Sequence, residues 1–204
     1  MRKATRLKKI LVRCQYAFLI MGIVSLGYSL LAVAEAARYQ AWAYRQLQQQ
    51  RAARPNPDLQ SGRMQPASFT DRSVVGRIEI PRIHLSAMIA EGTSGHVLRE
   101  GAGHVSGSAL PGQPGNVVIA AHRDTFFRRL GQLKTGDAIE LTTPDGQYFY
   151  RVRSTDIIGP DETWVLKPTS DQTLTLVTCY PFYYVGAAPQ RFVVRAQRLP
   201  APSQ

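Results

Sequence analysis

The sequence predicts an all-β domain, a small closed barrel of seven or eight strands with a few short helices, preceded by one N-terminal transmembrane helix. From Ser73 onward, short runs rich in β-branched and aromatic residues alternate with Gly, Pro, Asn and Asp, which is typical of a sandwich or barrel. Near the N-terminus lies one long apolar stretch without charge. A chain of 204 residues, 44% of them hydrophobic, can supply one sizeable core plus an accessory segment.

The predicted transmembrane helix covers residues 14–34. These 21 residues carry no charge, and as a helix they are long enough to cross a hydrocarbon core of about 30 Å. Six of the 25 basic residues lie within the first 13 positions, whereas Glu35 follows the stretch on its other side. The positive-inside bias therefore places residues 1–13 in the cytoplasm and everything after the single membrane pass outside it.

Two other interpretations of the apolar stretch are weaker. Ala32-Val33-Ala34 matches the small-residue pattern of a signal-peptide cleavage site, but the stretch is longer than the usual apolar region of about 7 to 15 residues. A buried helix of a soluble core usually keeps a polar stripe, and this stretch has none. We expect an uncleaved membrane anchor, and whether it is ever cleaved stays open.

Residues 35–72 are expected to form a helical stalk and a linker. The segment 35–54 is rich in Ala, Gln, Arg and Leu and lacks Gly and Pro, which favours a helix. We interpret it as a solvated spacer, with an interaction surface for a partner helix as the alternative. Pro55, Pro57 and Gly62 then indicate a flexible linker.

The basic charge does not predict a nucleic-acid partner. The formal net charge is +11, but the first 13 residues account for much of it. The remainder holds 19 basic and 14 acidic residues, a net charge of +5 that is spread without a Lys or Arg run. Nucleic-acid binding depends on clustered basic residues, so we expect none.

Residues 73–199 form the predicted barrel, and 200–204 a short C-terminal tail. The tetrapeptide 143–146, Thr-Pro-Asp-Gly, favours a turn that makes its two flanking runs a hairpin. Short helical turns are expected near 95–99, 124–130 and 161–166. The predicted strands are VVGRIEI (74–80), SAMIAEG (86–92), NVVIAAHR (116–123), DAIELTT (137–143), QYFYRVRSTDII (147–158), QTLTLVTC (172–179) and QRFVVRAQRL (190–199).

Cys179 is the first candidate for chemistry. Cys14, at the cytoplasmic end of the predicted span, cannot pair with it in one chain. An unpaired thiol outside the cytoplasm indicates an intermolecular bridge, an inert buried residue or a reactive nucleophile. Cys179 ends an alternating apolar run and Pro181 follows it, so the thiol is expected at a strand end facing an aromatic loop.

His122 and Arg191 are the other two candidates. His122 ends the apolar run 116–121, and an imidazole there can activate a thiol and protonate a leaving amine. Arg191 opens the last strand, and antiparallel pairing with the cysteine strand would bring its donors beside the thiol to hold an oxyanion. Each residue taken alone also fits a structural role, such as a packed histidine or a solvated strand-edge arginine. The tight Gly-Ala-Gly-His104 segment looks like a backbone feature.

Taken together, these motifs resemble the sortases, and among them the class D type. Residues 175–179 read TLVTC, where the family shows T-L-x-T-C, with His122 lying 57 residues upstream and Arg191 lying 12 residues downstream. Segments 103–127 and 178–194 are also similar, and the likeness covers about 74–198 plus the membrane anchor. One departure is Ala121, where many relatives have Gly; it removes no catalytic group.

The resemblance implies an eight-stranded sortase-type barrel and a cysteine transpeptidase. Such an enzyme cleaves an LPXTG-like sorting signal near the C-terminus of an exported protein through a thioacyl intermediate. It then transfers the acyl group to an amine, such as a peptidoglycan precursor of the cell envelope or a pilin lysine. Cys179 would be the nucleophile, His122 the acid/base and Arg191 the oxyanion stabiliser.

Other residues have less certain roles. Asp124 has two open interpretations, orienting His122 and capping the short helix after it, and we favour the cap. Asp161, Glu162 and Asp171 show no calcium-ligand pattern, so no metal or other cofactor is expected. For Val165 and its neighbours, packing on the barrel is the alternative to substrate contact. The residues predicted to bind substrate are Trp164, Val165, Leu166, Thr178 and Tyr183.

Two alternative functions stay open. An extracytoplasmic cysteine peptidase or amidase would use the same residues with water as the acceptor. A noncatalytic barrel that binds a surface partner would use Cys179 only for packing. The exact sorting motif, the acceptor amine and the oligomeric state do not follow from the sequence.

Overall fold

The computed structural model describes residues 2–53 and 72–200, with side chains from residue 11 onward. Most of the predicted linker and tail, 54–71 and 201–204, and the side chains of residues 1–10 in the basic N-terminus lie outside the described residues. The chain divides into two compact units, residues 1–38 and 39–204. Each unit is described by itself.

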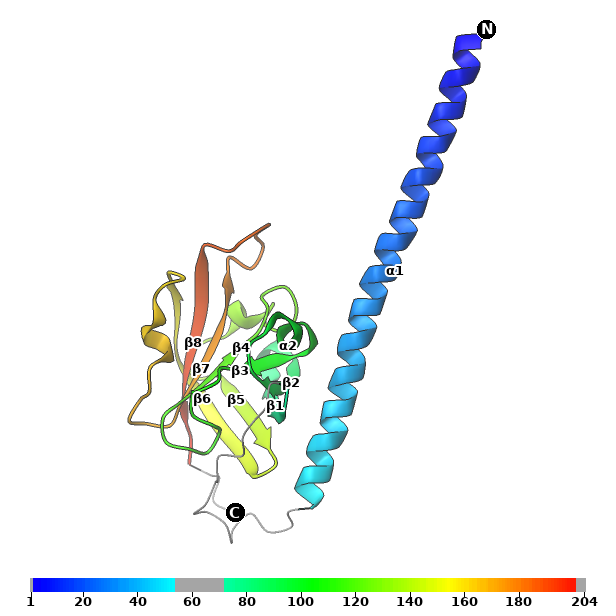
Figure 1. Cartoon of the computed structure of the whole chain (residues 1–204). Helices are drawn as coiled ribbons and strands as arrows, with labels where there is room; N and C mark the ends of the chain where they lie inside the picture. Colours follow the sequence, from blue (N-terminus) through cyan, green and yellow to red (C-terminus); the bar gives the residue numbers. More distant parts are fainter. Residues whose placement is uncertain (1, 54–71, 201–204) are drawn as a thin grey trace. The chain divides into compact units, whose positions relative to one another are not determined.

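Helix α1, Arg2–Ala52, is one continuous helix that includes the described residues of the first unit (Figure 1). Its part from Leu11 to Ala52 is long and apolar enough to cross a membrane. The helix ends shortly before Pro55, as expected where proline excludes helical backbone from the residue that precedes it. The predicted N-terminal helix is therefore present, as a candidate membrane span.

The C-terminal part of α1 belongs to the second unit and packs on the barrel. Three side chains spaced four residues apart, Tyr39, Ala43 and Leu47, lie on one helix face and are buried. Gln40 on the same part of the helix donates from Nε2 to the Glu100 carbonyl at 2.7 Å, and its Oε1 accepts from the Met88 amide at 2.8 Å. The packing partners are Val74, Met88, Ala90 and Val97.

This packing corrects the interpretation of the stalk as a solvated spacer. The spacing of Tyr39, Ala43 and Leu47 is the signal that the sequence contained, but Ala and Tyr at those positions are also common on solvated helices. The helix face is an interaction surface whose partner is the barrel of the same chain.

Eight strands form a closed barrel in the order β1-β2-β3-β4-β7-β8-β6-β5 (Figure 1). The pairs β2–β3 and β4–β7 are parallel, and the other pairs are antiparallel. Closure removes free sheet edges, which would otherwise pair with other chains. The strands are β1 Val74–Ile80, β2 Leu85–Glu91, β3 Ala102–His104, β4 Asn116–Ala120, β5 Ala138–Thr143, β6 Gly146–Ile158, β7 Thr173–Tyr180 and β8 Gln190–Arg198.

All seven predicted runs are strands, and 143–146 turns the β5–β6 hairpin as expected. The strand that the sequence did not predict is β3, because three residues are too short to show an alternating pattern. Within β3, a side chain on Gly103 would collide with the carbonyl oxygen of Gly92, which explains the glycine in this tight segment.

The short helices agree with expectation at two of three places. Helix α2, Gly95–Glu100, and the 3₁₀ helix η4, Thr163–Leu166, match the predicted turns. The predicted turn at 124–130 is wrong as a helix, since 123–129 form turns and the 3₁₀ helix η3 is Leu130–Gln132. Its cap lacks a side-chain hydrogen bond, so Asp124, which is exposed, does not cap it. The remaining 3₁₀ helix is η2, Pro81–Ile83.

Alternation along each strand separates the barrel interior from its outer face. On β7, Leu174 and Leu176 lie in the main core, while Val177 contacts a second, smaller cluster with Val193 of β8. Phe192 and Val194 of β8 belong to the main core. Residues that alternate with these core positions therefore face outward.

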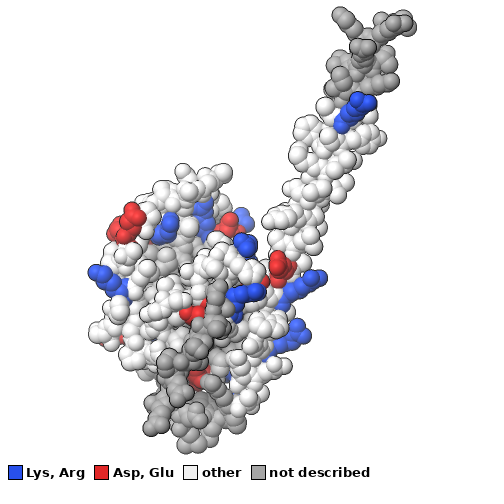
Figure 2. Space-filling view, in the orientation of Figure 1, with Lys and Arg blue, Asp and Glu red and all other residues white. Residues whose placement is uncertain are grey.

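Charged side chains of both signs lie on the face of the barrel in view (Figure 2). Figure 2 shows basic and acidic side chains interspersed over the face in view, without a single basic patch.

Replacing Leu47 by alanine is expected to lower the free energy of unfolding by about 2 to 4 kcal/mol, because its side chain is fully buried against the barrel. Gln48→Ala is the matched control, since Gln48 is exposed on the neighbouring helix position. Urea unfolding of the full chain in detergent measures both. Equal effects of the two substitutions would contradict the packing of the stalk.

Candidate active site

Strands β4 and β7 run parallel and bring two candidate residues to the same end of the barrel. The register pairs Ala120 with Val177. One residue further, the Ala121 amide donates to the Val177 carbonyl at 3.3 Å, and the Thr178 hydroxyl donates to the Ala121 carbonyl at 2.7 Å. His122 directly follows Ala121, and Cys179 directly follows Thr178. The two strands therefore bring the histidine and the cysteine to the same end of the barrel.

Thr178, which was predicted to bind substrate, is buried in the structure. Its hydroxyl is used by the Ala121 carbonyl. It pairs with Phe192, a residue of the barrel core, so it faces inward. Thr178 ties the histidine segment to the cysteine strand, away from the outer face.

Strands β7 and β8 lie side by side (Figure 1) and pair antiparallel, as expected. The register places Cys179 directly opposite Arg191. Side chains of directly opposite residues project to the same side of a sheet, with Cβ atoms about 4.5 to 5.5 Å apart. Both residues alternate with core positions, so they share the outer face of the barrel. Both are partly exposed, which leaves thiol and guanidinium accessible.

Arg191 is partly engaged by its own loop. Its Nη1 donates to the carbonyls of Ala188 at 3.2 Å and Gln190 at 2.9 Å. Its Nε and Nη2 make no hydrogen bond to the residues that the structure describes. Those two donors are available to a ligand on the outer face.

His122 emerges from β4 where the chain leaves the barrel. Ala121 lies in the core, so alternation turns His122 outward, and its side chain is partly exposed. Its carbonyl accepts from the Phe127 amide at 3.0 Å, so the backbone turns immediately after it. The following Asp124 lies in that turn and is exposed.

The β6–β7 loop packs on the outer face of strands β6, β7 and β8. Val165 is 4% exposed and packs with Ile158, Val177 and Val193, so it anchors the loop to the barrel. Val165 therefore packs on the barrel, which was the alternative to substrate contact.

The neighbours of Val165 stay accessible. Trp164 is 43% and Leu166 is 37% exposed. The Trp164 ring lies 5.8 Å from the Arg195 guanidinium carbon, and its Nε1 donates to Glu162 at 3.2 Å. On the other side, Tyr183 of the β7–β8 loop is 86% exposed. These three side chains are accessible to a ligand.

Asn116 fixes this loop, and it was not among the residues predicted from the sequence. Its amide nitrogen donates to the carbonyls of Val165 at 2.8 Å and Lys167 at 3.2 Å, and its oxygen accepts from Thr175 at 2.7 Å. Asn116 and Thr175 are both buried, and their polar groups are paired. The signal in the sequence is a polar residue on the same strand face as His122, at the start of an apolar run.

A buried polar network supports β4 from the other side. His104 of β3 contacts Glu91 of β2 at 2.7 Å through Nδ1, and its Nε2 lies 2.9 Å from the Ser108 hydroxyl. Ser106 donates to Glu91 at 2.7 Å, and the Val118 amide of β4 donates to Ser108 at 3.2 Å. The network holds the β3–β4 loop against β4. Among the described residues, His, Cys, Asp and Glu side chains form no group of three that would hold a metal ion.

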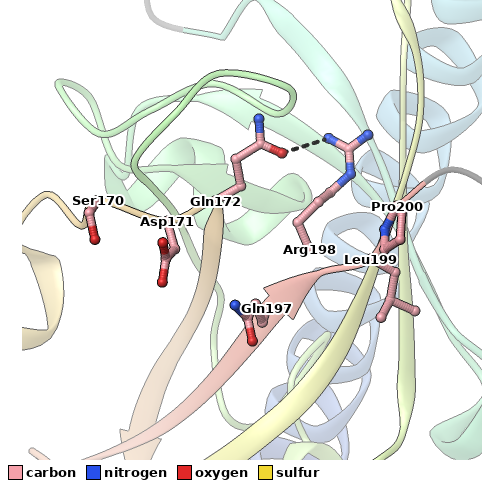
Figure 3. A pocket seen from close by; sticks show the side chains of 7 residues that line it. All are labelled: Ser170, Asp171, Gln172, Gln197, Arg198, Leu199 and Pro200. Carbon is pink, nitrogen blue, oxygen red and sulfur yellow. Dashed lines mark hydrogen bonds between the residues drawn. The ribbon is translucent and has the colours of Figure 1, made fainter.

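A polar hollow of about 450 Å³ lies at the opposite end of β7 and β8 (Figure 3). Arg198 donates to Gln172 across it at 3.4 Å. It begins next to Thr173, six residues before Cys179, which corresponds to about 20 Å along a strand. It is too far away to belong to the candidate site. Its lining residues are Ser170, Asp171, Gln172, Gln197, Arg198, Leu199 and Pro200.

Comparison with known families identifies the class of this barrel. The family model described as Sortase domain matches residues 78–199, more than half of the chain. The chain belongs to the sortase family. The expected likeness to class D members is confirmed by Sortase D of Bacillus subtilis (strain 168), which is 39% identical over 125 residues, 61% of this chain and 63% of that protein.

A further relative is Sortase SrtE1 of Streptomyces coelicolor, 31% identical over 151 residues, 65% of this chain and 43% of that protein. The chain thus spans less than two thirds of the length of these relatives.

Two solved structures share the barrel. The Sortase D5 transpeptidase of Clostridium perfringens has a TM-score of 0.65 at 23% identity, with 82% of this chain and 99% of that chain covered. Sortase C-1 of Actinomyces oris has a TM-score of 0.59 at 29% identity, covering 76% and 99%. The predicted eight-stranded sortase fold is therefore confirmed.

Glu91→Gln is expected to destabilise the protein at neutral pH and to have less effect in acid. Burial raises the pKa of the Glu91 carboxyl, but the hydrogen bonds from His104 and Ser106 outweigh burial and hold the pKa below its ordinary value of 4.5. A lowered folded-state pKa means that ionised Glu91 stabilises the fold, fully above the unfolded pKa and progressively less as pH falls through the folded value. Urea unfolding of both proteins from about pH 3 to about pH 7 measures the difference. A difference in the free energy of unfolding between wild type and Glu91→Gln that stays constant with pH would contradict the stabilising role of ionised Glu91.

Proposed function

We propose that this protein is a membrane-anchored cysteine transpeptidase. It cleaves an LPXTG-like sorting signal near the C-terminus of exported proteins and transfers the acyl group to an amine on the cell envelope or a pilin. The observation that carries the proposal is the direct pairing of Cys179 with Arg191 on the outer face, one strand away from the segment that ends in His122. Membership of the sortase family supports it.

The first half of the reaction forms the thioacyl enzyme. His122 takes the proton of the Cys179 thiol, and the sulfur attacks the Thr carbonyl carbon of the sorting signal, so that a carbon–sulfur bond forms. The Thr–Gly amide bond then breaks, and the proton held by His122 passes to the departing Gly amine.

The second half of the reaction reverses these steps with a new amine. The acceptor amine attacks the thioester carbonyl and gives a proton to His122, and the carbon–sulfur bond breaks as the sulfur of Cys179 leaves as a thiolate. His122 then passes that proton to the sulfur, which restores the thiol. The product is a new amide bond, and the enzyme returns to its starting state. Water in place of the amine would give hydrolysis instead.

Arg191 stabilises the tetrahedral oxyanion in both halves. Its Nη1 is held by two loop carbonyls, whereas its Nε and Nη2 make no hydrogen bond within the described chain and are free to donate. A charged, fixed pair of donors is suited to a developing negative charge. Removing one such donor typically lowers kcat by about 10² to 10³.

The exposed side chains on either side of Cys179 bind the sorting signal. Trp164 and Leu166 of the β6–β7 loop and Tyr183 of the β7–β8 loop offer apolar surface to the Leu-Pro part of the peptide. Val165 acts indirectly, by anchoring the first loop. Asp124, two residues after His122 and exposed, is the residue that would orient the imidazole.

The N-terminal helix anchors the enzyme with its N-terminus in the cytoplasm and the barrel outside. The length and apolar composition of α1 support the anchor, and the basic residues before it support the orientation. Substrates that have been exported and envelope amines are then on the same side as Cys179.

The activity is tested by incubating the full chain in detergent with LPXTG-type peptides, with and without a primary amine, and separating the products by mass. We expect amine-ligated peptide from the wild-type protein and none from Cys179→Ala. A hydrolysed peptide whether or not amine is present would indicate a cysteine peptidase. No product from well-folded protein with any peptide would favour a noncatalytic barrel.

The orientation is tested with C-terminal fusions expressed in bacteria. Alkaline phosphatase is active only outside the cytoplasm, and we expect the phosphatase fusion to be active and membrane-bound. A fusion to green fluorescent protein, which does not fold when exported unfolded, is expected to stay dark. A bright fluorescent fusion with inactive phosphatase would overturn the proposed orientation.

A further inference from the structure

The β7–β8 loop, residues 181–189, connects the strand of Cys179 with the strand of Arg191. Residues 183–187 are all exposed, and Val185 is 99% exposed. The tip of the loop therefore has little apolar packing to hold its shape. Polar contacts must do so, and within the described part of the chain they involve two arginines.

Arg123 supplies the first pair of contacts. Its Nη2 donates to the carbonyls of Tyr184 at 2.7 Å and Gly186 at 2.9 Å, and its guanidinium carbon lies 5.8 Å from the centre of the Tyr184 ring. Hydrogen bonds from a charged donor are stronger than those between neutral groups. Its Nη1 is buried and has no hydrogen-bond partner in the described chain, so the two carbonyls determine where the guanidinium lies.

Arg191, which follows the loop in the chain, supplies the second pair. Its Nη1 donates to the carbonyls of Ala188 and Gln190. The four accepting carbonyls thus belong to alternate residues of one stretch, the first two bound by Arg123 and the last two by Arg191. The conformation of the loop and the position of the Arg191 guanidinium are therefore linked.

We propose that Arg123 is a positioning residue that clamps the β7–β8 loop to the segment of His122, and through the loop keeps the free donors of Arg191 directed to the space beside Cys179. Arg123 adjoins His122 in the chain. The clamp therefore joins all three strand ends of the site. The effect on turnover rests on the proposed function, whereas the effect on the loop does not.

Arg128 provides a matched control. Its guanidinium carbon lies 6.0 Å from the ring of Tyr183 in the same loop, but it makes no hydrogen bond to loop carbonyls among the described residues. Arg128→Met removes the same charge and the same kind of ring contact. It leaves the four carbonyl contacts in place.

The test compares Arg123→Met, Arg123→Lys and Arg128→Met in the full chain in detergent, after equal thermal unfolding midpoints show that all are folded. Chymotrypsin cleavage after Tyr183 and Tyr184 reports release of the loop, because cleavage follows the population of the open form. We expect Arg123→Met to be cleaved about tenfold faster than wild type, and Arg128→Met at about the wild-type rate. Arg123→Lys keeps a charged donor and is expected to restore most of the protection.

Turnover of an LPXTG-type peptide separates positioning from binding. We expect Arg123→Met to lower kcat by about ten- to a hundredfold with little change in KM, the pattern of a misplaced transition-state group. A mutant cleaved no faster than Arg128→Met would overturn the clamp. A released loop with unchanged kcat would overturn its link to Arg191. If wild type turns over no peptide, the proposed function fails, while the cleavage rates still decide the clamp.

Discussion

The candidate site depends on the parallel pairing of β4 with β7. Because both strands run in the same direction, their C-terminal ends lie at the same end of the barrel. His122 follows two residues after the end of β4, and Cys179 is the last residue but one of β7. The register matters as much as the pairing. A slip of one residue would turn Cys179 into the barrel interior and bring Thr178 to the outer face. The hydrogen bond from Thr178 to the Ala121 carbonyl continues this register beyond the last strand pair.

The outer face of the barrel becomes a site because loops cover it on both sides. Asn116 and Thr175 are buried polar residues whose hydrogen bonds are satisfied by each other and by carbonyls of the β6–β7 loop. On the opposite side, Arg123 and Arg191 hold the β7–β8 loop through its backbone. Both loops are therefore fixed by polar contacts to the strands that carry the reactive residues, while their exposed apolar side chains stay free for a ligand.

Local patterns predicted much of this structure. Alternating runs identified every strand except β3, and the antiparallel pairing of the cysteine strand with the last strand followed from the spacing of Cys179 and Arg191. Contacts between distant segments were not predictable in the same way. A packed Val165 and an exposed one have the same local sequence, and the inward direction of Thr178 depends on a barrel that closes over many residues. The role of Asn116 depends on a loop about fifty residues further along the chain.

The central claim is that three strand ends form one acyl-transfer site, and intact-protein mass spectrometry tests it most directly. The full chain is mixed with an LPXTG-type peptide and quenched at short times. We expect an added mass equal to the peptide without its Gly-containing leaving group, located on Cys179, that forms more slowly in Arg191→Ala and disappears when a primary amine is added. No adduct on Cys179, or an adduct on another residue that persists in Cys179→Ala, would contradict the account.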